Sequence, residues 1–257
     1  MAIKKNGVFS LQELTAAVSS GVIKAKRPIE AGQIQPASMD LRLGAKAYRL
    51  VSSFLPEDST VLDRLRTKDS YGSDLVMYEV DISEGAILEK GSVYLIPLME
   101  ELKLPKGVEG KANPKSTIGR LDIFTRVIAD KNPRFDEISS GYKGQLFVEV
   151  MPRSFAIKVK EGLSLVQLRL RRGKCMLDDK QLKALNNKER LLYDGKKNLK
   201  NSDVLISNGM FMSVDLVGDK GSPIIGYKSK KNSHVVDLTK RDHYRIEDFW
   251  EPLKRNK

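Results

Sequence analysis

The segment Gln145-Leu146-Phe147-Val148-Glu149-Val150 carries the clearest strand pattern of the chain. Successive side chains of a β-strand point to opposite faces, so Leu146, Val148 and Val150 should share one face. Phe147 and Glu149 should then share the other. The stretch predicts a strand that places a carboxylate on the same face as an aromatic ring.

The same short period recurs along the first two thirds of the chain, between turns rich in Gly, Pro, Asp and Asn. In 163–170 the apolar residues switch from odd-numbered to even-numbered positions, which predicts a β-bulge. Many short strands of this kind indicate a mainly β fold, a distorted barrel or jelly roll. The other predicted strands are 41–43, 76–80, 93–96, 155–159 and 163–170.

One short helix should precede the strands. Ser10 and Glu13 have the spacing of a capping box, and Phe9 and Leu14 that of a hydrophobic staple. The helix is expected to run to Gly21, because glycine commonly follows a helix end.

The strand pattern stops after Arg171, and three regions are predicted: a first lobe at 1–172, a helix and linker at 173–207, and a second lobe at 208–257. Asp178 should cap the helix of the middle region. The second lobe begins with Ser213-Val214-Asp215-Leu216, which echoes Ser38-Met39-Asp40-Leu41. Asp40 precedes Glu149 by 109 residues, whereas only 42 residues follow Asp215, so we expect the second lobe to be truncated and incomplete.

Composition narrows the classes of function. The net charge is +12, but ten of the twelve excess charges lie in 171–200 and 226–257, as expected for a linker and a tail rather than for a nucleic-acid groove. No stretch approaches the roughly 20 apolar residues of a membrane span, and residues 1–20 contain no signal-peptide core. A single cysteine, Cys175, fits a reducing cytoplasm. We therefore expect a cytoplasmic protein that binds neither nucleic acid nor membrane.

Several catalytic signatures are absent from the sequence. Zinc enzymes need three or four closely spaced ligands, but the chain offers only Cys175, His234 and His243, which lie far apart and late. Both histidines also lie outside the strand-rich region, which disfavours a Ser-His-Asp or Cys-His site there. No Walker A or G-x-G-x-x-G motif occurs. Hydrolytic chemistry would have to use carboxylate, hydroxyl and guanidinium groups.

Two stretches supply such groups. In 112–121, Pro114 suits the start of a helical turn, which would leave the N–H groups of Lys115, Ser116 and Thr117 free to attract phosphate. Ser116 and Arg120 stand four residues apart and would share one helical face. Glu149 is the second candidate, because desolvation beside a ring can make a carboxylate a usable general base near neutral pH. A capped surface turn and a glutamate on a half-solvated strand are the alternatives for the two stretches.

From Gln33 to Leu170 the sequence resembles the dCTP deaminases of the trimeric dUTPase-like superfamily, especially their two-lobed bacterial form. The matching stretches are 33–44, 45–56, 112–130 and 141–170, and 248–253 resembles a passage near the start of the second lobe. The resemblance implies a distorted dUTPase-like β-barrel in a homo-oligomer, a trimer, with active sites at lobe or subunit interfaces. It also implies a nucleotide substrate, dCTP, bound with Mg²⁺ and without zinc or any other protein-held metal.

The resemblance also assigns roles to residues. Glu149 matches the catalytic glutamate, and Ser116 and Arg120 match the Ser-x-x-x-Arg element that positions water and stabilises charge. Lys115 stands where an arginine commonly holds the triphosphate, and Gln167 falls on a late glutamine motif. The matched stretches add Ala129, Asp130 and Tyr142 as substrate-binding positions. The family's Asp-Pro-Gly-aromatic run is replaced here by Ser139-Ser140-Gly141-Tyr142.

Three functions are compatible with this pattern. Deamination of dCTP to dUTP and ammonia is the first. Hydrolysis of dUTP, alone or coupled to deamination, is the second, because related barrels serve both reactions. A nucleotide-binding protein with weakened catalysis is the third, in view of the short second lobe.

Overall fold

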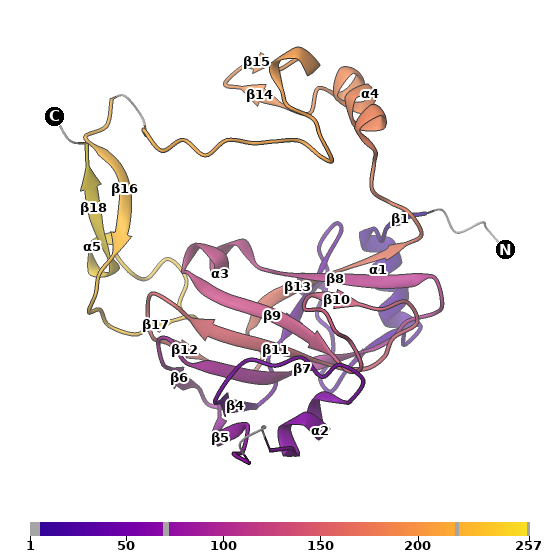
Figure 1. Ribbon diagram of the computed structural model, residues 1–257, viewed down its shortest axis with the longest axis vertical. Helices are drawn as coiled ribbons and strands as arrows, with labels where there is room; N and C mark the ends of the chain where they lie inside the picture. The colour runs from indigo at the N-terminus through magenta and orange to yellow at the C-terminus, as the bar shows by residue number, and fades with distance from the viewer. Residues whose placement is uncertain (1–5, 69–71, 219–220, 256–257) are drawn as a thin grey trace. The chain divides into compact units, whose positions relative to one another are not determined.

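The computed structural model describes residues 6–68, 72–218 and 221–255 (Figure 1). Contacts divide the chain into two units: unit 1 comprises Met1–Gly173 and Ser229–Glu251, and unit 2 comprises Lys174–Lys228 and Pro252–Lys257. Unit 1 is built mainly from β-strands, which confirms the prediction of a mainly β fold.

Two antiparallel sheets form the centre of unit 1. The first sheet has the strand order β1-β13-β8-β10, with β3 also paired to β13. The second has the order β5-β4-β7-β11-β9, with β2 paired to β7. The first sheet consists of β1 (Gly7–Val8), β3 (Met39–Arg42), β8 (Val108–Pro114), β10 (Glu137–Ile138) and β13 (Ser164–Arg172). The second consists of β2 (Ile23–Ala25), β4 (Lys46–Leu50), β5 (Val76–Asp81), β7 (Val93–Lys103), β9 (Ile123–Ala129) and β11 (Lys143–Pro152).

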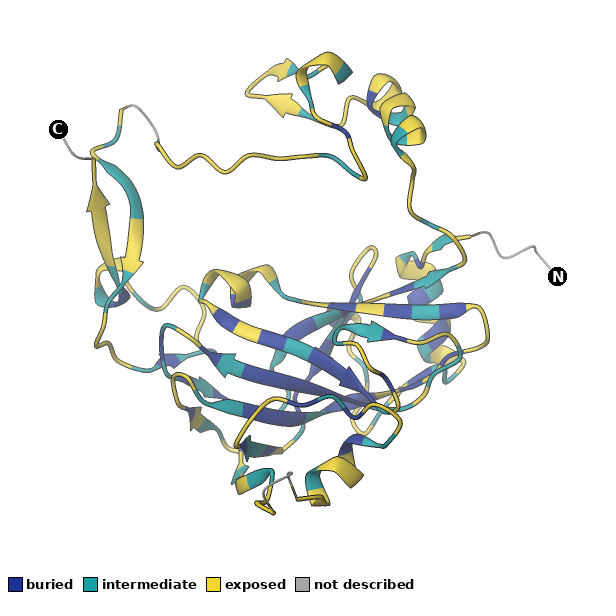
Figure 2. Ribbon diagram, in the orientation of Figure 1, coloured by how far each residue is buried: buried dark blue, intermediate teal, exposed yellow. Residues whose placement is uncertain are grey.

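Side chains of both sheets meet in one main core, to which β3, β8, β11 and β13 all contribute. A second, smaller core on the other face of β11 includes Phe147, Leu95 and Ile128. Figure 2 shows the central strands of unit 1 as largely buried. The predicted bulge in β13 is confirmed, because its pairing with β3 shifts register between Ser164 and Val166.

Helices occupy the ends and margins of the sheets. The predicted first helix is α1 (Leu11–Ser19), and its capping box between Ser10 and Glu13 is formed. Two further helices of unit 1, α2 (Val61–Arg66) and α3 (Ser116–Arg120), and the 3-10 turn η1 (Ala31–Gln33) lie between strands. Within the described ranges, no helix combines the length and the apolar character that crossing a bilayer requires.

Residues 229–251 belong to unit 1 by their contacts, whereas the sequence boundaries assign them to a second lobe. In this segment β17 (Val236–Asp237) pairs in parallel with β12 (Ile157–Val159), which also pairs with β6 (Ala86–Leu88). The short helix α5 (Ile246–Phe249) follows, and the rings of Phe249 and Trp250 pack edge-on against Phe155. Burial of these rings accounts for the return of the chain to unit 1.

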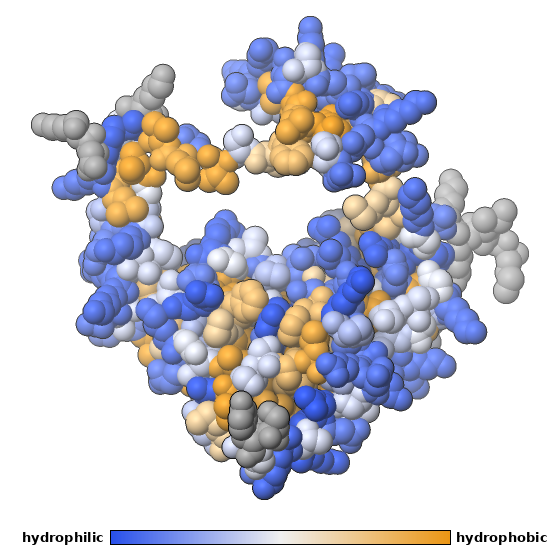
Figure 3. Space-filling model, viewed as in Figure 1, coloured by the Kyte–Doolittle hydropathy of each residue, from blue (hydrophilic) through white to orange (hydrophobic). Residues whose placement is uncertain are grey.

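Unit 2 contains the predicted helix α4 (Asp179–Glu189), and Asp178 is its N-cap as expected. Its remaining elements are β14 (Tyr193–Asp194), β15 (Lys197–Asn198), η2 (Asn201–Asp203), β16 (Ile224–Ser229) and β18 (Trp250–Lys254), although the ends of β16 and β18 belong to unit 1. Residues 211–218 form no strand. Val214 and Leu216 are each 81% exposed, in contrast to the fully buried Leu41 of the echoed motif, and the segment is apolar in Figure 3. Of the two similar motifs, only the first forms a strand, β3, because β13 lies beside it and pairs with its backbone.

Candidate active site

Glu149 lies near the end of β11, on the face predicted from the sequence. Leu146, Val148 and Val150 belong to the main core, while Phe147 belongs to the smaller core on the opposite face. The Glu149 residue is only 2% exposed. The alternative of a half-solvated surface glutamate is therefore wrong.

The partner of Glu149 is Arg126 on the neighbouring strand β9, directly opposite in the register. Arg126 donates from both Nε and Nη2 to the same carboxylate oxygen, Oε1, at 3.0 and 2.6 Å. The other oxygen, Oε2, is buried and has no hydrogen-bond partner among the described residues. The two oxygens of one carboxylate thus have different surroundings.

The guanidinium of Arg126 is itself held in place. Its carbon lies 3.6 Å from the centroid of the Phe135 ring and 4.9 Å from that of Phe124. Nη2 also donates to the Ser53 hydroxyl at 2.7 Å. Aromatic faces attract cations, so these contacts fix the plane of the guanidinium.

Asp136 is a second carboxyl group in this region. Its Oδ1 accepts from the Val127 N–H at 2.8 Å. Burial raises the pKa of Asp136 above its usual range, while that hydrogen bond and the charges of Arg126 and Lys111 act in the opposite direction. The negative charge of Glu149 adds to the increase.

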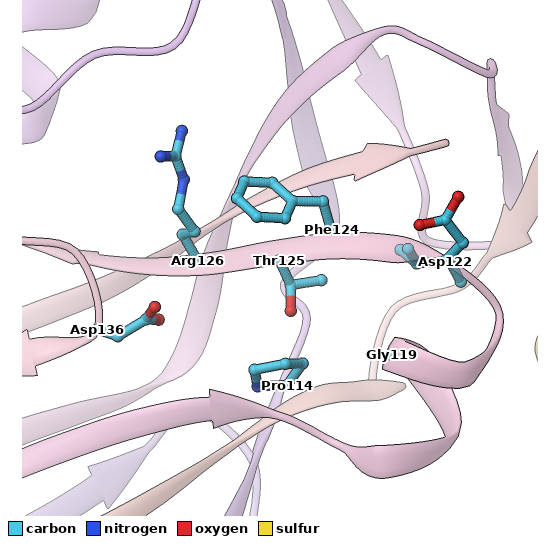
Figure 4. Close-up of a pocket in the computed structure, with 8 residues that line it drawn as sticks. Pro114, Gly119, Asp122, Phe124, Thr125, Arg126 and Asp136 are labelled. Atoms are coloured by element: carbon cyan, nitrogen blue, oxygen red, sulfur yellow. The ribbon is translucent and has the colours of Figure 1, made fainter. Parts of the chain in front are cut away.

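A cavity of about 320 Å³ opens beside β9 (Figure 4). In this view Arg126 and Phe124 project from one side of the strand, and Thr125 projects from the other toward Pro114. The hydroxyl of Thr125 is buried without a hydrogen-bond partner among the described residues. The cavity is lined by Pro114, Gly119, Asp122, Ile123, Phe124, Thr125, Arg126 and Asp136.

Ser116 and Arg120 share one face of α3, as their spacing predicts. Arg120 donates from Nη2 to the Ser116 hydroxyl and from Nε to the Ser116 carbonyl, both at 3.2 Å. The predicted start of the turn is wrong, because Pro114 ends strand β8 and the helix begins only at Ser116. Nor is the Lys115 N–H free, since it donates to the Leu165 carbonyl at 2.9 Å.

Lys115 and Gln167 both have partners in the 33–44 motif. Lys115 forms an ion pair with Asp40, and Asp40 lies opposite Gln167 in the pairing of β3 with β13. Gln167 Oε1 accepts from the Ser38 hydroxyl at 2.9 Å. Lys115, predicted to hold the triphosphate, and Gln167, predicted to lie near the nucleotide, thus each contact a polar residue of the 33–44 motif.

Asp130 and Tyr142 have partners within the chain. Asp130 Oδ1 accepts from the N–H of Val61, the first residue of α2, at 2.7 Å. Tyr142 donates its hydroxyl proton to the Gln145 carbonyl at 2.5 Å and accepts from the Asp130 N–H at 3.3 Å. Burial raises the pKa of Tyr142 to about 12. Ala129 is buried at the end of β9.

The predicted residues therefore form separate groups. Glu149 pairs with Arg126, and no hydrogen bond or ion pair among the described residues joins it to Ser116 or Arg120. Arg126 and Asp136 are missing from the sequence-based site, because only the register of β9 against β11 brings Arg126 to Glu149. In the part of the chain that is described, no three or more His, Cys, Asp or Glu side chains form a group suited to a metal ion.

Comparisons with known proteins assign the family. Residues 5–174 match the N-terminal domain model of 2'-deoxycytidine 5'-triphosphate deaminase, and residues 178–257 match the C-terminal domain model. A "dCTP deaminase, dUMP-forming" from a Sulfurihydrogenibium species is 30% identical over 154 residues, which cover 59% of this chain and 76% of that protein. The protein of the same name from Corynebacterium diphtheriae is 27% identical over 164 residues, 63% of this chain and 80% of that protein.

The fold also matches a solved structure. The crystal structure of 2'-deoxycytidine 5'-triphosphate deaminase from Agrobacterium tumefaciens superimposes with a TM-score of 0.86 at 39% sequence identity. The match covers 99% of this chain and 70% of the other. Together with the two domain models, it shows that the chain belongs to the 2'-deoxycytidine 5'-triphosphate deaminase family.

Proposed function

We propose that this protein deaminates dCTP to dUTP and ammonia. The observation that carries the proposal is the buried carboxylate of Glu149, which has one anchored and one unpartnered oxygen, in a chain of the dCTP deaminase family. The carboxylate is shielded from bulk solvent, and one of its oxygens has no hydrogen-bond donor. Such an oxygen is suited to take a proton from a single bound water molecule.

In the proposed reaction, water adds through its oxygen to C4 of the cytosine ring. Glu149 accepts one proton of this water as the C4–O bond forms and passes it to the ring nitrogen N3. Glu149 then takes the second proton of the water from the new C4 hydroxyl and gives it to the amino nitrogen, so that the C4–N4 bond breaks, the C4 carbonyl forms and ammonia leaves. One water molecule is consumed, and the carboxylate ends in its original state.

Ser116 and Arg120 would orient the water and stabilise the charge that develops at C4. Arg120 is exposed, and its hydrogen bonds within the described part of the chain go to Ser116 alone, so its remaining donors are available to a second copy of the chain. We propose that the active protein is a homo-oligomer, a trimer, in which α3 of one copy faces Glu149 of another.

Complementation tests this shared site. Glu149→Gln and Arg120→Ala are expected to be inactive separately, and mixing them after dissociation and reassociation should restore a fraction of the wild-type rate. Two inactive variants that stay inactive after subunit exchange has been demonstrated would contradict a site shared between copies.

The triphosphate would bind on the first sheet, where Lys115 supplies a cation and Gln167 a polar contact. We expect Mg²⁺ to arrive bound to the phosphates of the substrate. In proteins this ion usually keeps several water ligands and is held by substrate phosphates and one or two carboxylates, rather than by a cage of protein ligands. Ala129, Asp130 and Tyr142 would shape the pocket for base and sugar, with Asp130 and Tyr142 held by their partners within the chain.

Incubation of the purified protein with dCTP and Mg²⁺ is the direct test. We expect ammonia and dUTP in equal amounts. Pyrophosphate and dUMP would instead indicate that deamination is coupled to hydrolysis of the triphosphate. The two relatives named above are called dUMP-forming. Tight binding of dCTP without ammonia release would overturn the proposal in favour of a nucleotide-binding protein.

Metal dependence gives a second test. A zinc-selective chelator should leave the rate unchanged, while removal of Mg²⁺ should raise the KM for dCTP. Loss of activity with the zinc chelator, restored by zinc alone, would contradict metal-free chemistry. The nucleotide substrate and the single Cys175 also support a cytoplasmic location.

A further inference from the structure

The burial of Glu149 requires compensation for its charge. An ionised carboxylate that leaves water without a partner is strongly destabilised. Glu149 is 2% exposed, and its only charged partner among the described residues is Arg126. The arginine side chain is 24% exposed, so the pair lies at the edge of the protein interior and can be reached by solvent from one side.

The geometry of this pair differs from the usual arrangement. Arginine commonly binds a carboxylate through two parallel hydrogen bonds, one to each oxygen. Here both donors converge on Oε1, and Oε2 is left buried and unpartnered. A buried acceptor without a partner costs stability, which calls for an explanation. An ion pair that serves stability alone has no need to leave one oxygen buried and unpartnered.

The position of Arg126 is set independently of Glu149. The Phe135 ring stacks on the guanidinium, and the Ser53 hydroxyl accepts a hydrogen bond from Nη2, the third that this guanidinium donates. An arginine held by a ring and a hydroxyl can hold a carboxylate in one orientation. Its planar fork then selects which oxygen remains free.

We propose that Arg126 is a positioning residue for the deamination, which anchors Glu149 through Oε1 so that Oε2 alone is presented to the reacting water. The inference rests on the proposed function of Glu149 as the proton carrier. It assigns Arg126 a different task from Arg120, whose guanidinium contacts Ser116 and not Glu149. In this role Arg126 acts through its two hydrogen bonds to Glu149.

The test is a comparison of kcat and KM for dCTP deamination in Arg126→Gln, Arg126→Lys and the wild type. A misplacement of about 1 Å can cost about 10²-fold in rate, so Arg126→Gln should lower kcat by about that factor with KM changed less than about threefold. Arg126→Lys keeps the charge but lacks the fork, and its kcat should lie between the other two. Arg134→Gln, which removes an exposed arginine paired with Glu137, is the matched control and should behave as wild type.

A second variant covers the case in which Arg126→Gln does not fold. Phe135→Leu keeps the ion pair but removes the ring from the guanidinium, and it should lower kcat several-fold without raising KM. Unchanged kcat in a folded Arg126→Gln, or in Phe135→Leu if the former does not fold, would overturn the inference while leaving the proposed function intact. A wild-type protein that releases no ammonia would overturn the proposed function, and this inference with it.

Discussion

At the scale of single residues, the chemistry of Glu149 depends on a neighbour in the adjacent strand. The alternation of β11 places the carboxylate opposite Arg126, and the cation compensates a charge that burial would otherwise destabilise. In the proposed reaction, the unpartnered Oε2 is the atom that takes the proton. A surface glutamate would have solvent at both oxygens and no such distinction.

Replacement of this carboxylate should separate binding from catalysis. Glu149→Gln keeps the size of the side chain but cannot carry a proton, so kcat should fall by about 10²- to 10⁴-fold. The affinity for dCTP, measured by calorimetry, should change little. Glu137→Gln changes a partly exposed carboxylate of β10 and serves as the control. Near-normal turnover in Glu149→Gln would remove Glu149 from the mechanism.

Tyr142 should make stability depend on pH in the alkaline range. Its pKa is about 12 in the folded protein because of burial, against an ordinary value of 10. Between pH 10 and 12 the unfolded chain loses a proton that the folded protein keeps, so the free energy of unfolding should fall as pH rises through this window.

Tyr142→Phe should flatten that decline. Urea unfolding at pH 8, where Tyr142 is protonated in both states, measures the separate effect of losing its hydrogen bond to Gln145. Equal slopes for variant and wild type from pH 10 to 12 would show that Tyr142 does not contribute.

At the scale of elements, the placement of β3 depends on a buried ion pair. Glu100 of β7 is fully buried and accepts from the Arg42 backbone N–H at 2.7 Å and from Arg42 Nε at 2.8 Å. Arg42 also donates to the carbonyls of Pro28 and Arg27, and Gln33 donates to Glu100. The network ties residues 27–33 to the two sheets and so fixes the strand that carries Asp40.

Removal of one partner should destabilise the protein strongly. Glu100→Gln leaves the buried guanidinium of Arg42 without its counter-ion, and we expect a loss of about 3–5 kcal/mol in the free energy of unfolding. Urea denaturation with an unchanged m-value would measure it. Lys160→Met removes the exposed pair with Glu84 and should have little effect. Similar small effects for both variants would contradict a structural role of the Arg42–Glu100 pair.

At the scale of the whole molecule, unit 1 is assembled from two separate segments of the chain. Val236 pairs with Ile157 in the parallel contact of β17 with β12. Phe249 is 4% exposed and contacts the rings of Phe155 and Tyr244. These contacts join 229–251 to the sheets, although residues 174–228 separate the two segments of unit 1 in the sequence.

Limited proteolysis should therefore cut the chain without separating it. Trypsin should cleave between Asn186 and Ser207, where lysines and arginines are frequent. Denaturing gels should show two fragments, which co-elute in native gel filtration because 229–251 stays packed on unit 1. Phe249→Ala should weaken this association, since loss of a buried phenylalanine costs about 3–5 kcal/mol. Elution of the wild-type fragments as separate species would contradict the assignment of 229–251 to unit 1.

Local sequence alone determined much of the fold. The alternation at 145–150, the capping box of Ser10 and Glu13, the N-cap Asp178 and the bulge in 163–170 could all be predicted, because each depends on neighbours within a few positions. The pairing of Ser116 with Arg120 is of the same kind, since one helical turn brings them together. Resemblance to a family supplied the proposed role of Glu149, which no periodicity states.

Tertiary structure alone decided which distant residues meet. Arg126 reaches Glu149 only through the register of two strands, and Lys115 reaches Asp40 only because β3 and β8 flank β13. The return of 229–251 to unit 1 depends on an apolar surface around Phe155 that forms after the sheets assemble. Hydrophobic burial has no preferred direction, and strand register depends on many residues of both strands together. A short stretch of sequence therefore predicts neither the contacts between strands nor the packing of 229–251 on unit 1.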